Sequence, residues 1–278
     1  MLLFGLKHFL GRRPNAWIGL LLISVFVLAA LAGQIGTPHD PLATNFRTRL
    51  LAPGDGFLMG TDQFGRDVLS RMLIGARESL SIAVLSSGCA VVLGVAIGAT
   101  SSFFGGWADR IVSACLDALM AFPGLLLAMA IISVIGPGKY GVIFALALAY
   151  TPAVVRVIRS AVLSIREREY VDASRALGNG DLATILRHVV PNCIGPLTVI
   201  GTSLFASALL SESALSFLGI GVPPPFPTWG GMLADAKQFA ASAPWLVLAP
   251  GLAISAALLG TNMLGDALRD FFDPRMER

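Results

Sequence analysis

The chain has 278 residues, of which 55% are hydrophobic and 13% are charged, and its formal net charge is +3. This composition excludes a soluble protein, because so few charged side chains cannot supply a water-facing surface. The apolar residues fall into blocks long enough to cross about 30 Å of hydrocarbon as helices, and not into the short alternating strands of a β-barrel. We therefore expect an all-α polytopic membrane protein.

Six apolar blocks predict about six transmembrane helices. They cover residues 15–33, 79–103, 111–135, 140–160, 193–219 and 244–265. Lys7, Arg12 and Arg13 precede the first block and would also suit a signal peptide, but the length of the block favours a retained anchor. The sequence GPGKYG, residues 136–141, separates the third and fourth blocks and favours a tight turn.

The distribution of lysine and arginine predicts the orientation. With the amino terminus in the cytoplasm, 13 of the 20 Lys and Arg residues fall in cytoplasmic segments and seven on the other side. Because cytoplasmic loops of membrane proteins carry the excess of these residues, both termini are expected inside. The same bias accounts for most of the positive net charge, which therefore gives no indication of nucleic-acid binding.

The first part of the chain differs from the rest in its organisation. We expect residues 1–78 to form an anchor helix, an extracytoplasmic loop and an interfacial helix, and residues 79–278 to form a five-helix core. Asp62 can cap the interfacial helix over residues 60–78. Its apolar stripe would contain Val68, Leu69 and Met72, and its polar stripe Arg66, Ser70 and Arg77. This helix either anchors the entry to the second span or has a role at the outer face, in receiving a partner protein or in shaping an outer gate.

Two features inside the predicted spans indicate helix packing. Gly94 and Gly98, four residues apart, favour the close approach of another helix. Asp117 is within reach of Arg110 or Arg156, and an intramembrane charge needs such a partner. We interpret Asp117 as a structural residue.

The cysteines and histidines predict neither a disulfide framework nor a metal site, because none has partners at ligand spacing. They are Cys89, Cys115, Cys193, His8, His39 and His188. The chain is therefore expected to bind no metal or other cofactor.

Residues 161–192 form a polar interval between the fourth and fifth spans, in the cytoplasm under this orientation. Residues 161–177 predict a helix, Gly178-Asn179-Gly180 its left-handed stop, and Asp181 the cap of a second helix. The second helix would end before Pro191. Its apolar face consists of Leu182, Ile185, Leu186, Val189 and Val190.

Two interpretations of this helix pair remain open. It is either an elbow that lies on the bilayer surface or a docking element for a cytoplasmic partner. In the second case, the small Ala173 and Ala176 would permit close approach to the partner. Asp172, Arg175 and Asp181 would supply polar contacts at the rim of the interface.

The fifth span carries candidate residues of a translocation pathway. Ser203, Ser207 and Ser211 recur every four residues and form a polar stripe. Glu212 is an ionisable group inside the span and could meet a cationic amine in the pathway. Alternatively, Glu212 and the serines form hydrogen bonds to neighbouring helices or to a neighbouring membrane subunit. The loop GVPPPFPTWGGM after this span is stiffened by its four prolines and suits either docking or closure of the pore mouth.

The polar interval also resembles a known family. Asp172-Ala173-Ser174, Gly178 four residues later and Pro191 thirteen residues after Gly178 are similar to the EAA loop of permease subunits in bacterial ABC importers. The sequence departs from that pattern at four positions: Asp172 for Glu, Ser174 for Ala, His188 for an aliphatic residue and Val190 for Leu.

Three further stretches, residues 59–80, 212–233 and 264–275, resemble the second permease of the dipeptide, oligopeptide and nickel importer branch. The resemblance implies the type I importer permease fold, a sister permease in a heterodimer, two cytoplasmic ATPase subunits and an extracytoplasmic solute-binding protein. It assigns ATPase coupling to the residues of the loop: Asp172, Ala173, Ser174, Arg175, Ala176, Gly178, Asp181 and Pro191.

No ATPase site is expected in this chain. A P-loop needs Gly, four residues and then Gly-Lys-Ser/Thr, but the nearest stretch, at Gly138-Lys139, has Ser133 and Tyr140 at two required positions. ATP and magnesium are therefore expected in the partner subunits.

The cargo and two other protein classes stay open at this stage. The resemblance allows peptides, nickel or another small solute. A secondary transporter is an alternative, although no inverted repeat is visible. An intramembrane hydrolase would need a nucleophile and a base inside a span, and the sequence offers no such pair.

Overall fold

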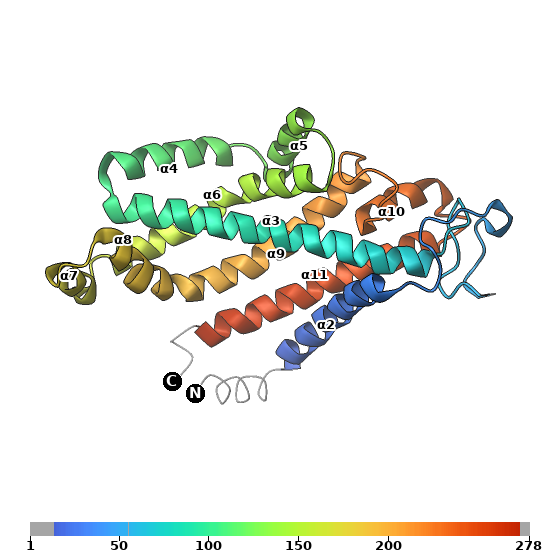
Figure 1. Cartoon of the computed structure of the whole chain (residues 1–278), viewed down its shortest axis with the longest axis horizontal. Coiled ribbons are helices and arrows are strands. Elements are labelled where there is room, and N and C mark those ends of the chain that lie inside the picture. Colours follow the sequence, from blue (N-terminus) through green and yellow to red (C-terminus); the bar gives the residue numbers. More distant parts are fainter. Residues whose placement is uncertain (1–13, 55, 273–278) are drawn as a thin grey trace.

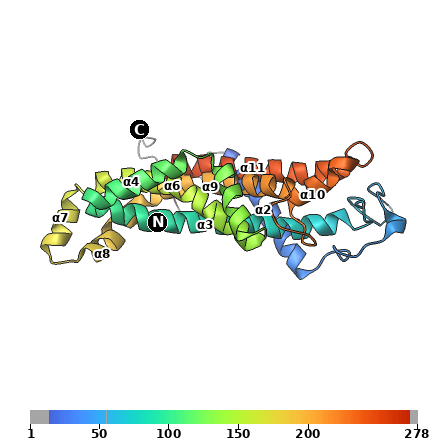
Figure 2. The ribbon, with the colours of Figure 1, turned by 90° about the horizontal axis from the view of Figure 1, so that it is seen from above.

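The computed structural model describes residues 14–54 and 56–272, an elongated bundle of helices in which these residues form no β-strand. Helices α7 (Glu169–Ala176) and α8 (Asp181–Thr184) lie at one end, which we call the elbow end (Figure 1). The loop before α3 and the helix α10 (Trp229–Ala236) lie at the opposite, loop end, and both ends are visible in the rotated view of Figure 2. Six charged or histidine residues used in the sequence analysis lie outside the described residues: Lys7, His8, Arg12, Arg13, Arg275 and Arg278.

Five helices are long and apolar enough to cross a membrane, and one bent pair raises the number to six. The helices of these candidate spans are α2 (Pro14–Ile35), α3 (Val68–Phe104), α6 (Lys139–Ile165), α9 (Ile194–Phe217) and α11 (Trp245–Phe272), and the pair is α4 (Gly106–Met120) and α5 (Gly124–Ile135). The prediction of an all-α polytopic membrane protein is confirmed.

Helix α3 corrects the predicted start of the second span. We expected a separate interfacial helix over residues 60–78, capped by Asp62. The structure instead has one continuous helix of 37 residues, about 55 Å long at 1.5 Å per residue. Asp67 is its N-cap and accepts the Ser70 N–H at 3.0 Å. No proline interrupts α3, so it continues through residue 78. The predicted interfacial helix and the predicted second span therefore belong to one helix.

The packing of α3 against α6 confirms the prediction for the two glycines. A Cβ atom on Gly94 would collide with the Val154 side chain, and one on Gly98 would lie 3.1 Å from Ile158 Cβ. Both partners belong to α6 and are fully buried. The glycines therefore let α3 and α6 approach closely.

The third predicted span, residues 111–135, is not a straight helix. It is divided into α4 and α5, whose axes are inclined by 92°. Pro123 is the N-cap of α5 and has extended backbone angles. Since proline disfavours a helical conformation in the residue before it, the break falls at this position. The predicted turn at residues 136–141 begins with Gly136 and Gly138, both at positive φ.

Trp229 fixes the loop end to the bundle. It is the largest fully buried side chain of the described residues. Its backbone N–H donates to Ser79 Oγ at 3.1 Å, and its indole N–H donates to the Met72 carbonyl at 3.2 Å. The ring also makes an edge-on contact with Phe26, with the centroids 5.4 Å apart. The proline-rich loop and α10 are thereby tied to the first turns of α3.

Candidate functional site

The elbow between α6 and α9 is the first candidate site. The predicted helix over residues 161–177 is wrong as a single helix, because α6 ends at Ile165 and α7 begins at Glu169. No glycine or proline marks this break. Val162 and Val171 on either side of it are both fully buried in one apolar cluster. Folding α7 back over the core buries Val171, which a continuous helix would carry past the core.

The stop at Gly178 is confirmed and has the geometry of a Schellman motif. Gly178 has φ +83°. Its N–H donates to the Arg175 carbonyl at 2.9 Å, and the Asn179 N–H donates to the Ser174 carbonyl at 3.2 Å. These two bonds satisfy carbonyls that the end of α7 would otherwise leave unpaired. The direction in which the chain leaves α7 is therefore fixed.

The second half of the elbow differs from the prediction in two ways. Gly180 is the N-cap of α8, and Asp181 is its first residue, not its cap. Pro191 does not end the helical path. The chain continues through a π-helical turn, Ile185–Val189, and a 3-10 turn, Val190–Cys193, directly into α9. Pro191 lies near the start of the 3-10 turn. The first residues of such a turn donate no hydrogen bond within it, so the missing N–H of proline is tolerated there.

A buried polar contact joins the two halves of the elbow. The hydroxyl oxygens of Ser174 and Thr184 lie 3.0 Å apart, and both side chains are buried. The Asn179 side-chain amide donates to Ser174 Oγ at 3.2 Å. The serine that departs from the family pattern thus has a hydroxyl partner in this chain. Thr184 was not among the residues predicted from the sequence.

The elbow is packed firmly on the helix core. Val171, Ile185 and Val189 are buried in the cluster that also contains Phe103 of α3. The Arg175 guanidinium lies over the Phe103 ring, 4.5 Å from its centroid. Through these contacts the elbow packs against the end of α3.

The outward surface of the elbow is apolar and uncovered in this chain. Leu177 is 83% exposed, Leu182 64% and Leu186 60%. Ala173 and Ala176 are also exposed. The apolar face predicted for the second helix is therefore split: its isoleucine and first valine face the core, and its leucines face outward.

Asp172 and Asp181, the acidic members of the predicted rim, are exposed as well. Asp181 Oδ1 lies 3.5 Å from Arg175 Nε, so the predicted rim residues are partly paired with each other. The structure thus brings all the predicted coupling residues except Pro191 to the exposed tip or to the contact between its halves.

Two ion pairs connect α4 and α6. Asp117 pairs with Arg156 at 2.8 Å, one of the two partners that we predicted for it. Arg159 makes two hydrogen bonds to Asp109, at 2.8 Å and 2.7 Å. The helix α4 has no fully buried residue. These pairs are therefore its main polar attachment to the bundle.

The predicted pathway residues on α9 are not all on one side. Ser207 is exposed, and the Tyr150 hydroxyl lies 2.7 Å from Ser211 Oγ. Glu212 is fully buried and accepts a hydrogen bond from Ser216 Oγ at 2.9 Å. Within this chain the serine stripe is accessible, whereas Glu212 faces neighbouring helices.

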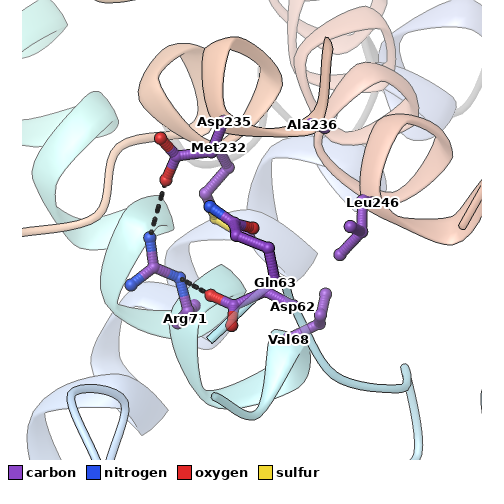
Figure 3. Close-up of a pocket in the computed structure, with 8 residues that line it drawn as sticks. All are labelled: Asp62, Gln63, Val68, Arg71, Met232, Asp235, Ala236 and Leu246. Atoms are coloured by element: carbon purple, nitrogen blue, oxygen red, sulfur yellow. Dashed lines mark ion pairs between the residues drawn. The ribbon is translucent and has the colours of Figure 1, made fainter. Parts of the chain in front are cut away.

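The loop end contains a cluster of two arginines and two aspartates, and Figure 3 shows three of these residues around a small cavity. Arg66 Nε lies 2.6 Å from Asp62 Oδ2, and Arg71 Nε lies 3.5 Å from the same oxygen. Asp235, on α10, lies 3.5 Å from Arg71 Nη2 and 3.8 Å from Arg66 Nη2. Asp62 is held at hydrogen-bond distance, whereas Asp235 is held by looser ion pairs.

The turn before α3 positions these arginines. Asp62 Oδ1 accepts the backbone N–H groups of Phe64 and Arg66, each at 2.9 Å. Gly65 has φ +73°, and a Cβ atom there would collide with the backbone of Asn45. Asp62 therefore closes a tight turn in place of the helix cap that we predicted for it.

A cleft of about 540 Å³ lies beside the cluster. It is lined by the proline-rich loop and by Arg66, Arg71 and Asp235. Burial raises the pKa of the Asp235 carboxyl, although both arginines act to lower it. The cleft was not predicted, because Asp235 and the arginines are far apart in the sequence. The dense run of charges at residues 62–71 was the only signal of it.

Comparison with known proteins identifies clear relatives. Residues 90–278 match the family described as binding-protein-dependent transport system inner membrane component. The chain is 44% identical to a protein of Brucella suis biovar 1 named as a peptide transport system permease, over 96% of this chain and 90% of that protein. It is 41% identical to the di/tripeptide transport system permease protein DppC of Pseudomonas aeruginosa, with 96% and 90% covered.

A solved structure has the same fold. A chain of the methionine ABC transporter MetNI, in inward-facing conformations, aligns with a TM-score of 0.58. The alignment covers 73% of this chain and 96% of that chain at 18% sequence identity. At this level of identity the likeness concerns the fold alone.

Proposed function

The chain belongs to the family of binding-protein-dependent transport system inner membrane components, and from this membership we propose that it is the permease subunit of an ATP-driven importer of di- or oligopeptides. It is a multi-pass protein of the inner membrane with the fold of an ABC importer permease. The peptide cargo is supported by the relatives described above, which are named for peptide transport. Nickel, the alternative cargo, has no such support from them.

The working transporter would contain several partners. They are a sister permease that completes the translocation path, two cytoplasmic ATPase subunits and an extracytoplasmic solute-binding protein. Since no P-loop occurs in this sequence, the energy must come from the ATPase subunits, which would bind the ATP and magnesium.

In the proposed orientation the elbow end is cytoplasmic and the loop end is extracytoplasmic, with both termini inside. The elbow region supports this orientation, because it carries Arg166, Arg168, Arg175 and Arg187 within a short interval. Such an excess of arginine is typical of cytoplasmic loops.

The observation that carries the proposal is the combination of a fixed elbow and an exposed apolar tip. The buried Ser174–Thr184 contact and the Schellman turn at Gly178 make the elbow stiff. The exposed Leu177, Leu182 and Leu186 suit a groove in an ATPase subunit. Closure of the ATPase subunits would then move the elbow as one body and tilt the helices packed on it.

The translocation path is proposed to run beside the accessible serines of α9. Ser207 and Ser211 offer hydroxyl groups to a passing peptide. Glu212 would support this helix from inside the bundle through its contact with Ser216.

The test is transport by the complete system. The chain would be purified with its partners, reconstituted in proteoliposomes with a solute-binding protein, and assayed for uptake of labelled di- and oligopeptides. We expect uptake that requires both ATP and the binding protein and that fails when residues 172–180 are replaced. Uptake without ATP would contradict the proposal and favour a secondary transporter.

A further inference from the structure

The cleft at the loop end contains a buried cation with unused hydrogen-bonding capacity. The Arg71 side chain is only 5% exposed. Its Nη1 atom is buried and has no hydrogen-bond partner among the described residues, and the same is true of Arg66 Nη2. Buried guanidinium donors are normally satisfied. Two guanidinium donors beside one cleft therefore have unused capacity for an acceptor.

The small cavity of Figure 3 does not supply that acceptor. Its volume of about 10 Å³ holds one water molecule at most. In Figure 3 two nitrogens of Arg71 are linked to Asp62 and Asp235, and the third nitrogen points away from this cavity. The larger cleft, also lined by Arg71, is the remaining open space described around this side chain.

Asp235 is the more exposed of the two aspartates that face the arginines. It is 45% exposed, and its oxygen lies 3.5 Å and 3.8 Å from the two arginines, beyond a strong hydrogen bond. Asp62, in contrast, is buried and fixed by its turn. The arginine pair thus has one permanent counter-ion and one loosely held counter-ion that faces the cleft.

The residues that line the cleft favour binding of an anion next to the two arginines. Four of its residues are prolines of the loop, Pro223, Pro224, Pro225 and Pro227, which have no backbone N–H to donate. Phe64 and Phe226 add apolar surface. Among the lining residues only Arg66 and Arg71 carry positive charge, whereas Thr44, Ser216 and Thr228 add neutral hydroxyl groups. The prolines and phenylalanines suit an apolar side chain.

We propose that this cleft is a binding site for the C-terminal carboxylate of an entering peptide, in which Arg71 and Arg66 hold the carboxylate and Asp235 is the counter-ion that it displaces. The proposal rests on the proposed function and names a contact for its substrate. The cleft volume lies within the range of small-molecule sites. Because Asp235 competes for the same donors, the peptide is held weakly and can leave toward the path.

The first test measures binding without transport. The complete transporter, without binding protein and without ATP, would be titrated with dialanine and with dialanine amide by saturation-transfer NMR. We expect the free acid to bind about tenfold more tightly than the amide, because only the acid pairs with the arginines. Equal binding of acid and amide would overturn the proposal.

Variants assign the effect to the cleft. Arg71→Gln should remove the preference for the acid. Arg47→Gln should keep it, because Arg47 is an exposed arginine in the segment before α3 and does not line the cleft. Asp235→Asn should tighten binding of the acid several-fold and leave the amide unchanged. Because Asp235 is half-exposed, this variant should fold, and it still tests the proposal if Arg71→Gln fails to fold. Unchanged binding in Asp235→Asn would contradict the displacement.

Two outcomes separate this proposal from the proposed function. Peptide binding with the expected preference, but no ATP-driven uptake, would refute the importer and retain the carboxylate site. Normal uptake together with no preference for the acid would retain the importer and refute the site. If Arg71→Gln only weakens docking of the ligand-free binding protein, the cleft receives a protein and the peptide site is wrong.

Discussion

The hydroxyl groups of Ser174 and Thr184 meet at 3.0 Å across the elbow and are both buried. Removing one of them leaves the other without this partner in an apolar environment. We expect Ser174→Ala or Thr184→Val alone to destabilise the elbow by about 1–3 kcal/mol, and the double variant to cost less than the sum. A double-mutant cycle on thermal unfolding of the purified transporter measures this. Strictly additive losses would show that the contact carries no coupling.

Gly178 tests whether the shape of the elbow transmits energy. Its φ of +83° disfavours a β-branched side chain, although a Cβ atom there would meet nothing within 4 Å. Gly178→Val should therefore destabilise the left-handed backbone conformation at this position by about 1–2 kcal/mol, without a steric clash. We expect continued ATP hydrolysis with loss of uptake. Gly180→Val is the matched control, because Gly180 has equal space and an ordinary φ of −65°. Normal uptake by Gly178→Val would contradict the mechanism.

Variants of two nearby apolar residues distinguish a role in docking of the ATPase subunits from a role in folding. Leu182 is exposed, and Ile185 is 2% exposed in the core cluster. We expect Leu182→Ala to leave thermal stability unchanged and to reduce co-purification of the ATPase subunits. Ile185→Ala should lower the free energy of unfolding by about 2–5 kcal/mol, because it opens a cavity. The docking assignment fails if Leu182→Ala retains its full complement of ATPase subunits.

Substitutions of Glu212 test whether this residue lies outside the translocation pathway. Since the carboxylate is buried against Ser216, we expect Glu212→Gln to transport cationic and neutral dipeptides with an unchanged ratio. Glu212→Leu should instead lower stability by about 1–3 kcal/mol, because it removes the acceptor of a buried hydroxyl. Paired uptake assays measure the ratio. A selective loss of cationic peptides in Glu212→Gln would place this carboxylate in the pathway.

Asp235 makes stability depend on pH in a defined direction. Its carboxyl faces Arg71, Arg66 and Asp62, and burial raises its pKa. The folded protein therefore holds this proton more tightly than the unfolded chain does. The resulting stabilisation is present below the ordinary pKa of aspartate and is lost as pH rises through the raised pKa.

The measurement is the difference in unfolding temperature between the wild-type protein and Asp235→Asn. We expect the wild-type protein to gain stability relative to this variant as pH falls from neutral into the acidic range, because asparagine cannot titrate. Other acidic groups cancel in the difference. A difference that stays constant with pH, or that changes in the opposite direction, would contradict the raised pKa.

Features set by local chemistry could be predicted from the sequence. The apolar lengths gave the spans of α2, α6 and α9 closely, the glycine spacing indicated the contact of α3 with α6, and Gly178 indicated the end of α7. The pairing of Asp117 with Arg156 followed from the need of an intramembrane charge for a partner. Each of these depends on a few neighbouring residues or on a strong physical requirement.

Features set by tertiary packing could not be predicted. The break between α6 and α7 has no breaker residue and exists because Val171 is buried. Pro191 was expected to end a helix, but a π-helical turn before it keeps the path continuous. The arginine cluster depends on Asp235, which the chain brings close only through α10. Sequence spacing contains no information on such distant neighbours.

Helix α3 connects the two ends of the molecule without a joint. Arg71 lies in its first turn and contributes to the cleft, whereas Phe103 lies in its last turn and supports Arg175 of the elbow. A helix without an internal break is stiff over about 55 Å. A tilt imposed at one end must therefore reappear at the other, as in a rod. The cleft and the elbow need no chain of side-chain contacts between them to move in step.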